Sequence, residues 1–130
     1  MSIYFVYHGV NTMLVEFRVK NFRSLRDEQV LSLVASKDKT LQDTHTQATG
    51  ISAAPTLLRS AVVYGANASG KSNLIKALQY MRGVVTESAT AIQPGQTFAV
   101  QPFRLDADSA SQPSEFEVTF LLDGVRYQYG

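Results

Sequence analysis

The sequence contains no cysteine, which excludes a disulfide framework and zinc sites built from thiolates. The absence suits a reducing compartment, and we expect a cytoplasmic protein. The two histidines, His8 and His45, lack any metal-ligand spacing and are predicted to be ordinary polar residues. No apolar run approaches the length of a membrane span, so no membrane partner is expected. Ile3–Tyr7 lacks the basic flank and cleavage site of a signal peptide.

Strong charge is also missing. The formal net charge is +1, so the chain has no global electrostatic signature of a nucleic-acid or membrane partner. A local basic patch stays open, and DNA is a partner that the charge does not support. With 130 residues, of which 45% are hydrophobic, the chain is large enough for one modest domain with a core.

The stretch Gly65–Ser72 reads Gly-Ala-Asn-Ala-Ser-Gly-Lys-Ser and fits the phosphate-binding P-loop pattern. The preceding apolar run, Ala61–Tyr64, predicts the buried strand that such a loop follows. The following apolar residues fall at helical spacing, and they are Leu74, Ile75, Leu78, Met81 and Val85. Strand, loop and helix therefore agree on a nucleotide site. The alternative is a glycine-rich strand-to-helix turn with an incidental Lys-Ser.

Each residue type in the loop has a physical role. Gly65 and Gly70 allow backbone conformations and close approach that a Cβ would block. Successive N–H groups can then form a nest for phosphate oxygens at the positive end of the helix. Lys71 would reach the β- and γ-phosphates as the catalytic cation, and Ser72 would ligate Mg²⁺. The expected nucleotide-binding residues of the loop are Gly65, Ala66, Asn67, Ala68, Ser69, Gly70, Lys71, Ser72 and Asn73.

The chain before the loop predicts strands. Period-two alternation over Leu14–Asn21 predicts a half-buried strand, and a polar turn leads to a second, antiparallel strand over Gln29–Val34. Ser36–Pro55 reads as a surface excursion with a short strand near Thr40–Thr44. Met1–Thr12 has two interpretations, a leader added upstream of a natural start at Met13 or an extra edge strand. We expect one domain over residues 13–130.

The chain after the loop predicts a helix and a hairpin. The helix is expected to end between Gly83 and Ala91. An extended segment over Phe98–Leu105 and a small-residue loop over Asp106–Ser114 follow. Alternating residues then predict two strands joined by a primed turn at Asp123-Gly124.

The order of elements favours a particular α/β fold. Two antiparallel strands precede the P-loop strand, and a hairpin follows the P-loop helix. This order predicts a P-loop NTPase with a mixed core and an antiparallel β layer, as in the first lobe of an ABC-type ATPase head.

The stretches Leu14–Ser24 and Tyr64–Leu74 resemble the N-terminus of the RecF/SMC/OLD-like ATPases. Among these, the chain looks most similar to bacterial AAA-family proteins linked to abortive infection and phage defence, from Met13 to about Tyr129. The resemblance implies ATP and Mg²⁺ as cofactors, a homodimer that closes around ATP, and a partner nuclease or toxin.

The resemblance also implies site residues. Asn67 would face the terminal phosphate, and Arg23 and Ser24 would lie beside the nucleotide, near the base or phosphates. The alternatives are a solvated turn arginine at Arg23, and at Asn67 a loop residue that tolerates left-handed backbone.

Some parts of the family pattern are missing. The family places Asp-Glu after an apolar strand, but here Gly124 follows Asp123, and the alternation marks a hairpin turn. We find no signature motif, D-loop or switch histidine, and nothing around Gln101 supports a Q-loop. We therefore expect the chain to be about the first third of a protein, incomplete at its C-terminus and cut by truncation or a broken frame.

The leading hypothesis is the N-terminal lobe of an ATPase that drives a partner effector. In that case the chain alone should bind ATP weakly without turnover, because the acids are absent. A second hypothesis is a nucleotide-binding or interaction module that does not hydrolyse. A third is a small GTPase or nucleotide kinase, although Ser36–Lys39 does not form a guanine-recognition motif and no arginine-rich lid is present.

Overall fold

The structure is a computed structural model that describes residues 2–4, 12–87 and 99–130. The chain divides into two units, and each is described by itself. Unit 1 comprises Met1–Phe17, Val30–Gly65 and Glu117–Gly130, and unit 2 comprises Arg18–Gln29 and Ala66–Phe116.

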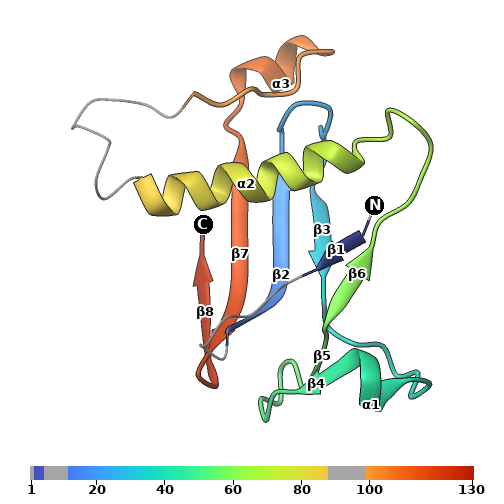
Figure 1. The fold of residues 1–130 in the computed structure, drawn as a ribbon. Coiled ribbons are helices and arrows are strands. Elements are labelled where there is room, and N and C mark those ends of the chain that lie inside the picture. Colours follow the sequence, from blue (N-terminus) through green and yellow to red (C-terminus); the bar gives the residue numbers. More distant parts are fainter. Residues whose placement is uncertain (1, 5–11, 88–98) are drawn as a thin grey trace. The chain divides into compact units, whose positions relative to one another are not determined.

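The regular elements are labelled in Figure 1. The strands are β1 (Ser2–Tyr4), β2 (Thr12–Lys20), β3 (Gln29–Ser32), β4 (Thr46–Ala48), β5 (Thr56–Leu58), β6 (Ser60–Val62), β7 (Glu115–Leu122) and β8 (Val125–Tyr129). The helices are α1 (Gln42–His45), α2 (Lys71–Glu87) and α3 (Ala107–Ser111). The strands form one sheet of order β3-β2-β7-β8 and two antiparallel pairs, β1-β6 and β4-β5. The fold is thus mixed α/β with antiparallel pairing, as the coarser part of the sequence interpretation predicts.

The hairpin β7–β8 forms where the alternation predicts it. The two strands pair antiparallel with Leu122 opposite Val125, which leaves two residues in the turn. Asp123 has φ 49° and Gly124 φ 79°, and two positive φ values define the primed turn that Asp-Gly favours. On β7 the more buried side chains are Thr119 and Leu121. The predicted hairpin and its turn type are confirmed.

The core of unit 1 packs strand residues against the chain that returns from the excursion. A buried cluster joins β2, β5, β7 and the residues before β5; its members are Met13, Val15, Ala54, Leu57 and Leu121, with Ile51 packed against it. Leu57 and Leu33 are completely buried. Burying each such side chain stabilises the fold by about 2 kcal/mol. The N–H of Leu33 donates to Val15 at 2.9 Å, and the N–H of Leu58 donates to Leu33 at 2.7 Å.

The short strand predicted near Thr40–Thr44 is wrong. The structure has a turn followed by α1, and the strand β4 begins only at Thr46. Asp38 accepts a hydrogen bond from the N–H of Thr40 at 2.8 Å, and Leu41 adopts left-handed backbone with φ 63°. The hydroxyl of Thr44 donates to the Leu41 carbonyl at 3.2 Å. These local side-chain bonds favour a turn over a ladder, and a propensity for strand does not outweigh them.

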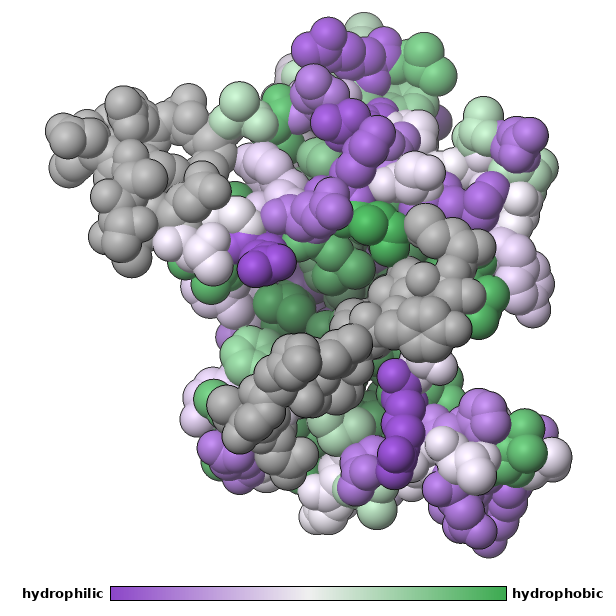
Figure 2. All heavy atoms as spheres, viewed as in Figure 1, coloured by the Kyte–Doolittle hydropathy of each residue, from purple (hydrophilic) through white to green (hydrophobic). Residues whose placement is uncertain are grey.

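The strand before the P-loop is present, but it is not buried as predicted. β6 ends at Val62, which is 57% exposed, and Tyr64 beyond it is 85% exposed. β6 pairs with β1, which lies in the segment interpreted as either a leader or an edge strand. An apolar run shows only that a strand can be buried, whereas the cover must come from other elements. Figure 2 shows other places where hydrophobic residues reach the surface among hydrophilic ones.

Unit 2 is built on α2, the helix predicted after the P-loop. Gly83 does not end this helix, which is described through Glu87. Its Ala77 and Met81 are buried, while Val85, predicted on the same apolar face, is 46% exposed. Tyr80 contacts Phe22 and Phe116, with ring centroids 5.8 and 5.0 Å away. This aromatic cluster fastens the helix to the turn after β2 and to the start of β7.

The segment between α2 and β7 differs from the expected loop. Asp106 caps the five-residue helix α3, which the small residues did not reveal. Residues 99–105 contain no regular strand, and Phe98 and the expected break at Ile92–Gly95 lie outside the described residues. Within the described part of the chain, no helix is long and apolar enough to cross a membrane.

Candidate functional site

The P-loop residues Ala66–Gly70 lead directly into α2, which begins at Lys71. Gly70 has φ 91°, and its carbonyl accepts from the N–H groups of Asn73 at 2.8 Å and Leu74 at 3.1 Å. These two bonds start the helix, so the loop ends on the positive pole of the α2 dipole. Ala68 adopts the left-handed conformation with φ 63°. Left-handed backbone is therefore at Ala68 and not at Asn67, where one sequence interpretation put it.

Gly70 also meets the turn that follows β2. A Cβ at this position would lie 3.0 Å from Cδ2 of Leu25 and 3.3 Å from Oγ of Ser24. Its positive φ independently disfavours any side chain. The second loop glycine is thus required for both reasons that the motif suggests, backbone conformation and close approach.

Lys71 lies inside the loop that it follows. Its Nζ donates to the carbonyl of Ala66 at 2.6 Å and is 3.4 Å from Oγ of Ser69. A lysine ammonium held against loop oxygens can transfer those hydrogen bonds to a phosphate, which is a stronger, charged acceptor. Asn67, Ser69 and Ser72 are exposed, so a ligand can reach their side chains.

Ser24 is bonded to the first turn of the helix that follows the loop. Its Oγ accepts a hydrogen bond from Nδ2 of Asn73 at 2.7 Å, across 49 positions of sequence. Ser24, Gly70 and Asn73 therefore form one group in unit 2. Because Asn73 lies in the first turn of α2, this bond fixes the turn against the helix start.

Arg23 is half-buried, unlike a solvated turn arginine. Its backbone has φ 54°, and its N–H donates to the carbonyl of Gln101 at 2.8 Å. The guanidinium carbon lies 5.5 Å from the centre of the Phe22 ring. Its Nε is buried and has no hydrogen-bond partner within the described residues.

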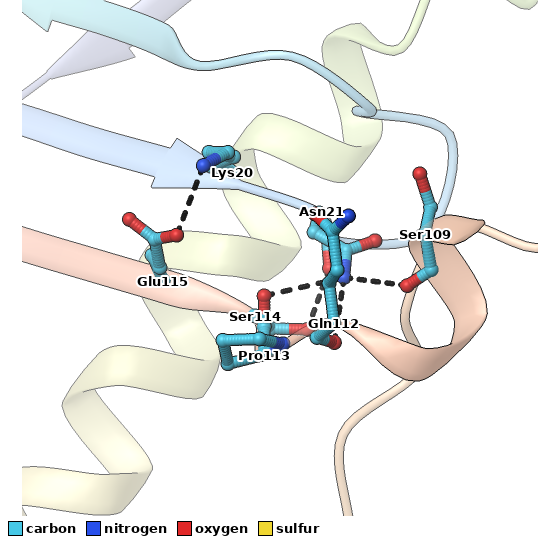
Figure 3. A network of polar contacts seen from close by, with 7 residues as sticks. All are labelled: Lys20, Asn21, Ser109, Gln112, Pro113, Ser114 and Glu115. Carbon is cyan, nitrogen blue, oxygen red and sulfur yellow. Dashed lines mark hydrogen bonds and ion pairs between the residues drawn. The ribbon is translucent and has the colours of Figure 1, made fainter.

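The residue that holds this turn is Asn21, which the sequence reading did not single out. Asn21 is 2% exposed and has φ 53°, a conformation that asparagine tolerates well. Figure 3 shows its side chain among the segment that leads into β7. Its Nδ2 lies 2.8, 2.9 and 3.2 Å from three carbonyl oxygens, those of Ser109, Gln112 and Pro113. Its Oδ1 accepts from the N–H of Phe103 at 3.0 Å.

Asp106 supplies a second tie between the turn and this segment. Its carboxylate accepts from the N–H of Ser109 at 2.6 Å and pairs with Nε of Arg26 at 3.0 Å. The pKa of Asp106 is lowered, mainly by the hydrogen bond from the Ser109 backbone. The Ser109 hydroxyl and the charge of Arg26 lower it further, while desolvation acts in the opposite direction. The only sequence signal for this tie is an aspartate before small residues, which is typical of a helix N-cap.

The remaining features of the site are the acid Asp123 and the residues that could bind a metal ion. Asp123 is exposed in the β7–β8 turn, as predicted. Within the described residues, no group of three or more histidine, aspartate or glutamate side chains could hold a metal ion. His45 ends α1, with Nδ1 2.7 Å from Oγ1 of Thr44, and His8 lies outside the described residues.

A protein-family model described as "AAA domain, putative AbiEii toxin, Type IV TA system" matches residues 60–130, more than half of the chain. The match begins at β6 and includes the loop, α2 and the hairpin. No curated protein and no solved structure matches the chain.

Proposed function

Because the chain belongs to this family of AAA domains, we propose that residues 65–73 bind the triphosphate of ATP. Family membership gives a P-loop, ATPase-like nucleotide-binding domain, and the ligand and residue roles are the finer proposal. Lys71 binds the β- and γ-phosphates, the loop amides surround the phosphate oxygens, and Asn67 faces the terminal phosphate.

The observation that carries this proposal is the position of Lys71. Its ammonium lies 2.6 Å from the Ala66 carbonyl, within a loop that ends at the N-terminus of a helix of 17 residues. A helix dipole, backbone donors and a lysine in one loop all favour an anion. The loop's exposure leaves room for a phosphate chain.

The residues present fit MgATP as the ligand. Mg²⁺ is usually held by substrate phosphates and a few protein oxygens, and the exposed hydroxyl of Ser72 in the first turn of α2 offers one oxygen. Ser24 accepts a hydrogen bond from Asn73 and so positions the first turn of α2 beside the proposed phosphate site. Arg23 lines a cavity whose walls include no loop residue.

At the level of the family, the proposal is an ATPase of the RecF/SMC/OLD-like type, with residues 13–130 as an ABC-type lobe. The element order and the contact between the turn after β2 and the loop support it. A homodimer around ATP, a nuclease or toxin partner and a role in phage defence belong to the same proposal.

A second candidate is a module that binds nucleotide without hydrolysing it. The observation that favours it is the place of Asp123, the one acid that follows an apolar strand as a Walker B acid would. It is exposed in a tight turn. Phosphate release by the purified chain, by Lys71→Ala and by Asp123→Ala decides between the two. Steady turnover lost in both variants would give Asp123 the role of the hydrolytic acid.

The binding test uses Lys71→Ala. We expect MgATP affinity to fall by about 30- to 100-fold, because a charge-assisted contact with the phosphates is lost. Calorimetric titration measures the affinity, and thermal unfolding checks that the fold is kept. The matched control is Lys39→Ala, an exposed lysine in the excursion of unit 1, which should bind as the parent does. Equal affinities for Lys71→Ala and the parent would refute the site.

A further inference from the structure

Unit 2 contains a cavity of about 380 Å³ beside the middle turns of α2. Lys76, Gln79 and Tyr80 line it from the helix, where their spacing puts them on one face. Phe22 and Arg23 line it from the turn after β2, and Gln101 lines it from the segment before α3. No residue of the P-loop takes part in these walls.

One wall of the cavity is aromatic and held in place. Phe22 and Tyr80 lie with ring centroids 5.8 Å apart, and Phe116 packs against both, at 5.3 and 5.0 Å. Phe22 is buried, so its ring does not need to be ordered when a ligand arrives. The half-buried Tyr80 ring, held by the two others, offers a flat group a stacking surface at low entropic cost.

The other walls carry positive charge and hydrogen-bond donors. The Arg23 guanidinium is a cation, and its buried Nε lacks an acceptor within the described residues. The guanidinium also carries donors on its two terminal nitrogens, and Arg23 lines the cavity. Lys76 adds a second, exposed cation, and among the described residues that line the cavity there is no carboxylate to neutralise the two. Gln79 and Gln101 add amides that can both donate and accept.

We propose that this cavity binds a nucleoside phosphate unit, separate from the nucleotide on the P-loop. Tyr80, backed by the buried Phe22 ring, stacks on the base, the two glutamine amides meet its polar edge, and Arg23 and Lys76 bind the phosphate. A carboxylate ligand would use only the cations, and an apolar ligand only the rings. The volume lies within the range of about 300–1,000 Å³ typical of small-molecule sites.

The position along α2 supports a separate site. Lys76 and Tyr80 follow Lys71 by five and nine residues. At about 1.5 Å of rise per residue, they lie roughly 7 and 14 Å along the helix from the lysine that holds the phosphates. The loop proposed to bind phosphates lies at the N-terminal end of that span.

The test titrates the 130-residue chain with three probes: AMP, a short oligodeoxyadenylate and inorganic tripolyphosphate. AMP and the oligonucleotide report on the cavity as a free nucleotide or as part of a single strand, and tripolyphosphate reports on the P-loop. The variants are Tyr80→Leu, Lys76→Gln and Lys71→Ala. Lys39→Gln is the charge-matched control for Lys76→Gln.

We expect Tyr80→Leu to weaken AMP or oligonucleotide binding by about tenfold, the usual cost of losing a stacking surface. Lys76→Gln should weaken it by about threefold and leave tripolyphosphate binding unchanged. Lys71→Ala should weaken tripolyphosphate binding and leave AMP and oligonucleotide binding unchanged. Tighter binding of the oligonucleotide than of AMP would identify a single strand as the source, and the opposite order a free nucleotide.

Three results would overturn the proposal. If neither AMP nor the oligonucleotide binds, the cavity is not a nucleotide site. The same holds if Lys76→Gln, like Lys39→Gln, binds AMP and the oligonucleotide as the parent does. If Lys71→Ala abolishes AMP and tripolyphosphate binding together, the cavity belongs to the P-loop nucleotide and is not separate. Lys76 is exposed, so its variant carries the test even if Tyr80→Leu fails to fold. If the parent chain does not bind tripolyphosphate, that result contradicts only the proposal for the P-loop.

Discussion

The turn Asn21–Arg26 and the P-loop Ala66–Gly70 lie in the same unit but are held in different ways. In the turn, Asn21, Phe22 and Leu25 are buried. The Asn21 side chain forms hydrogen bonds with the backbone of residues 103–113, about 80 to 90 positions further along the chain. The loop is largely exposed and bonds mainly to itself, through Ser69 and Lys71 to the Ala66 carbonyl.

The difference shows how a binding site combines rigidity with adaptability. A turn with several buried hydrogen bonds to a distant segment keeps one shape and can position a neighbour, because moving it would break those bonds at once. An exposed loop closed by a lysine can exchange that lysine's bonds for a phosphate. The turn contacts the loop at Gly70 and the helix α2 at Asn73. These contacts hold the start of α2 in place against the turn.

The largest effect on stability is expected from Asn21→Asp. The change keeps size and tolerance of left-handed backbone, but it replaces a donor that faces three carbonyl oxygens with an acceptor. We expect a loss of about 3 kcal/mol in the free energy of unfolding, measured by urea denaturation. The matched control is Asn67→Asp in the exposed loop, which should change stability by less than about 0.5 kcal/mol. Equal losses at the two positions would abolish the contrast between turn and loop.

The next effect concerns the contact between the two regions. Gly70→Ala should destabilise by about 2 kcal/mol, because it strains the backbone and presses on Leu25 and Ser24. Gly50→Ala is the control, since Gly50 has φ 74° but nothing within 4 Å of an added Cβ. Its cost should be about 1 kcal/mol, from backbone strain alone. If the two variants unfold at the same urea concentration, the close approach at Gly70 contributes nothing.

A smaller effect is expected from Asp106→Asn in acid. Hydrogen bonds and Arg26 lower the folded pKa of Asp106, so its stabilisation is present above the ordinary aspartate pKa of about 3.9. That stabilisation is lost as the pH falls through the lowered folded pKa. The variant should therefore lose less stability than the parent on acidification, as followed by melting temperature against pH.

Asp38→Asn is the control for this effect. The pKa of Asp38 is also lowered, by the N–H of Thr40, but its bonds stay within one local turn of unit 1. At neutral pH, Asp106→Asn should melt below Asp38→Asn, because only Asp106 ties the turn to α3 through an ion pair. The reverse order would show that the tie does not stabilise the turn.

The smallest effect is expected when the chain starts at Met13. The truncation removes β1, which pairs with β6 over three residues, and the first residue of β2, Thr12; an isolated two-stranded pair is marginal in water. We expect the melting temperature to stay within about two degrees of the parent and MgATP affinity to stay unchanged. A larger drop would show that β1 supports the strand that precedes the loop, and that the loop depends on more than its own bonds.

Several elements could be predicted from the sequence because their causes are local. β2 follows the alternation of Val15, Phe17 and Val19, and the β7–β8 turn follows from Asp123-Gly124. The loop and the start of α2 at Lys71 follow from the motif and the helical spacing after it. Periodicity and turn chemistry act over a few residues, so they can be read without knowing the rest of the fold.

Other features were decided only by the tertiary structure. Whether the apolar run Ala61–Tyr64 is buried depends on what covers it, and Asn21 gains its partners only because residues 103–114 fold back onto it. The cavity at Arg23 likewise needs α2, the turn and Gln101 together. The sequence by itself determined which segments can form strands, helix and loop. Burial, hydrogen-bond satisfaction and cavities depend on contacts between distant positions, and no local pattern encodes those contacts.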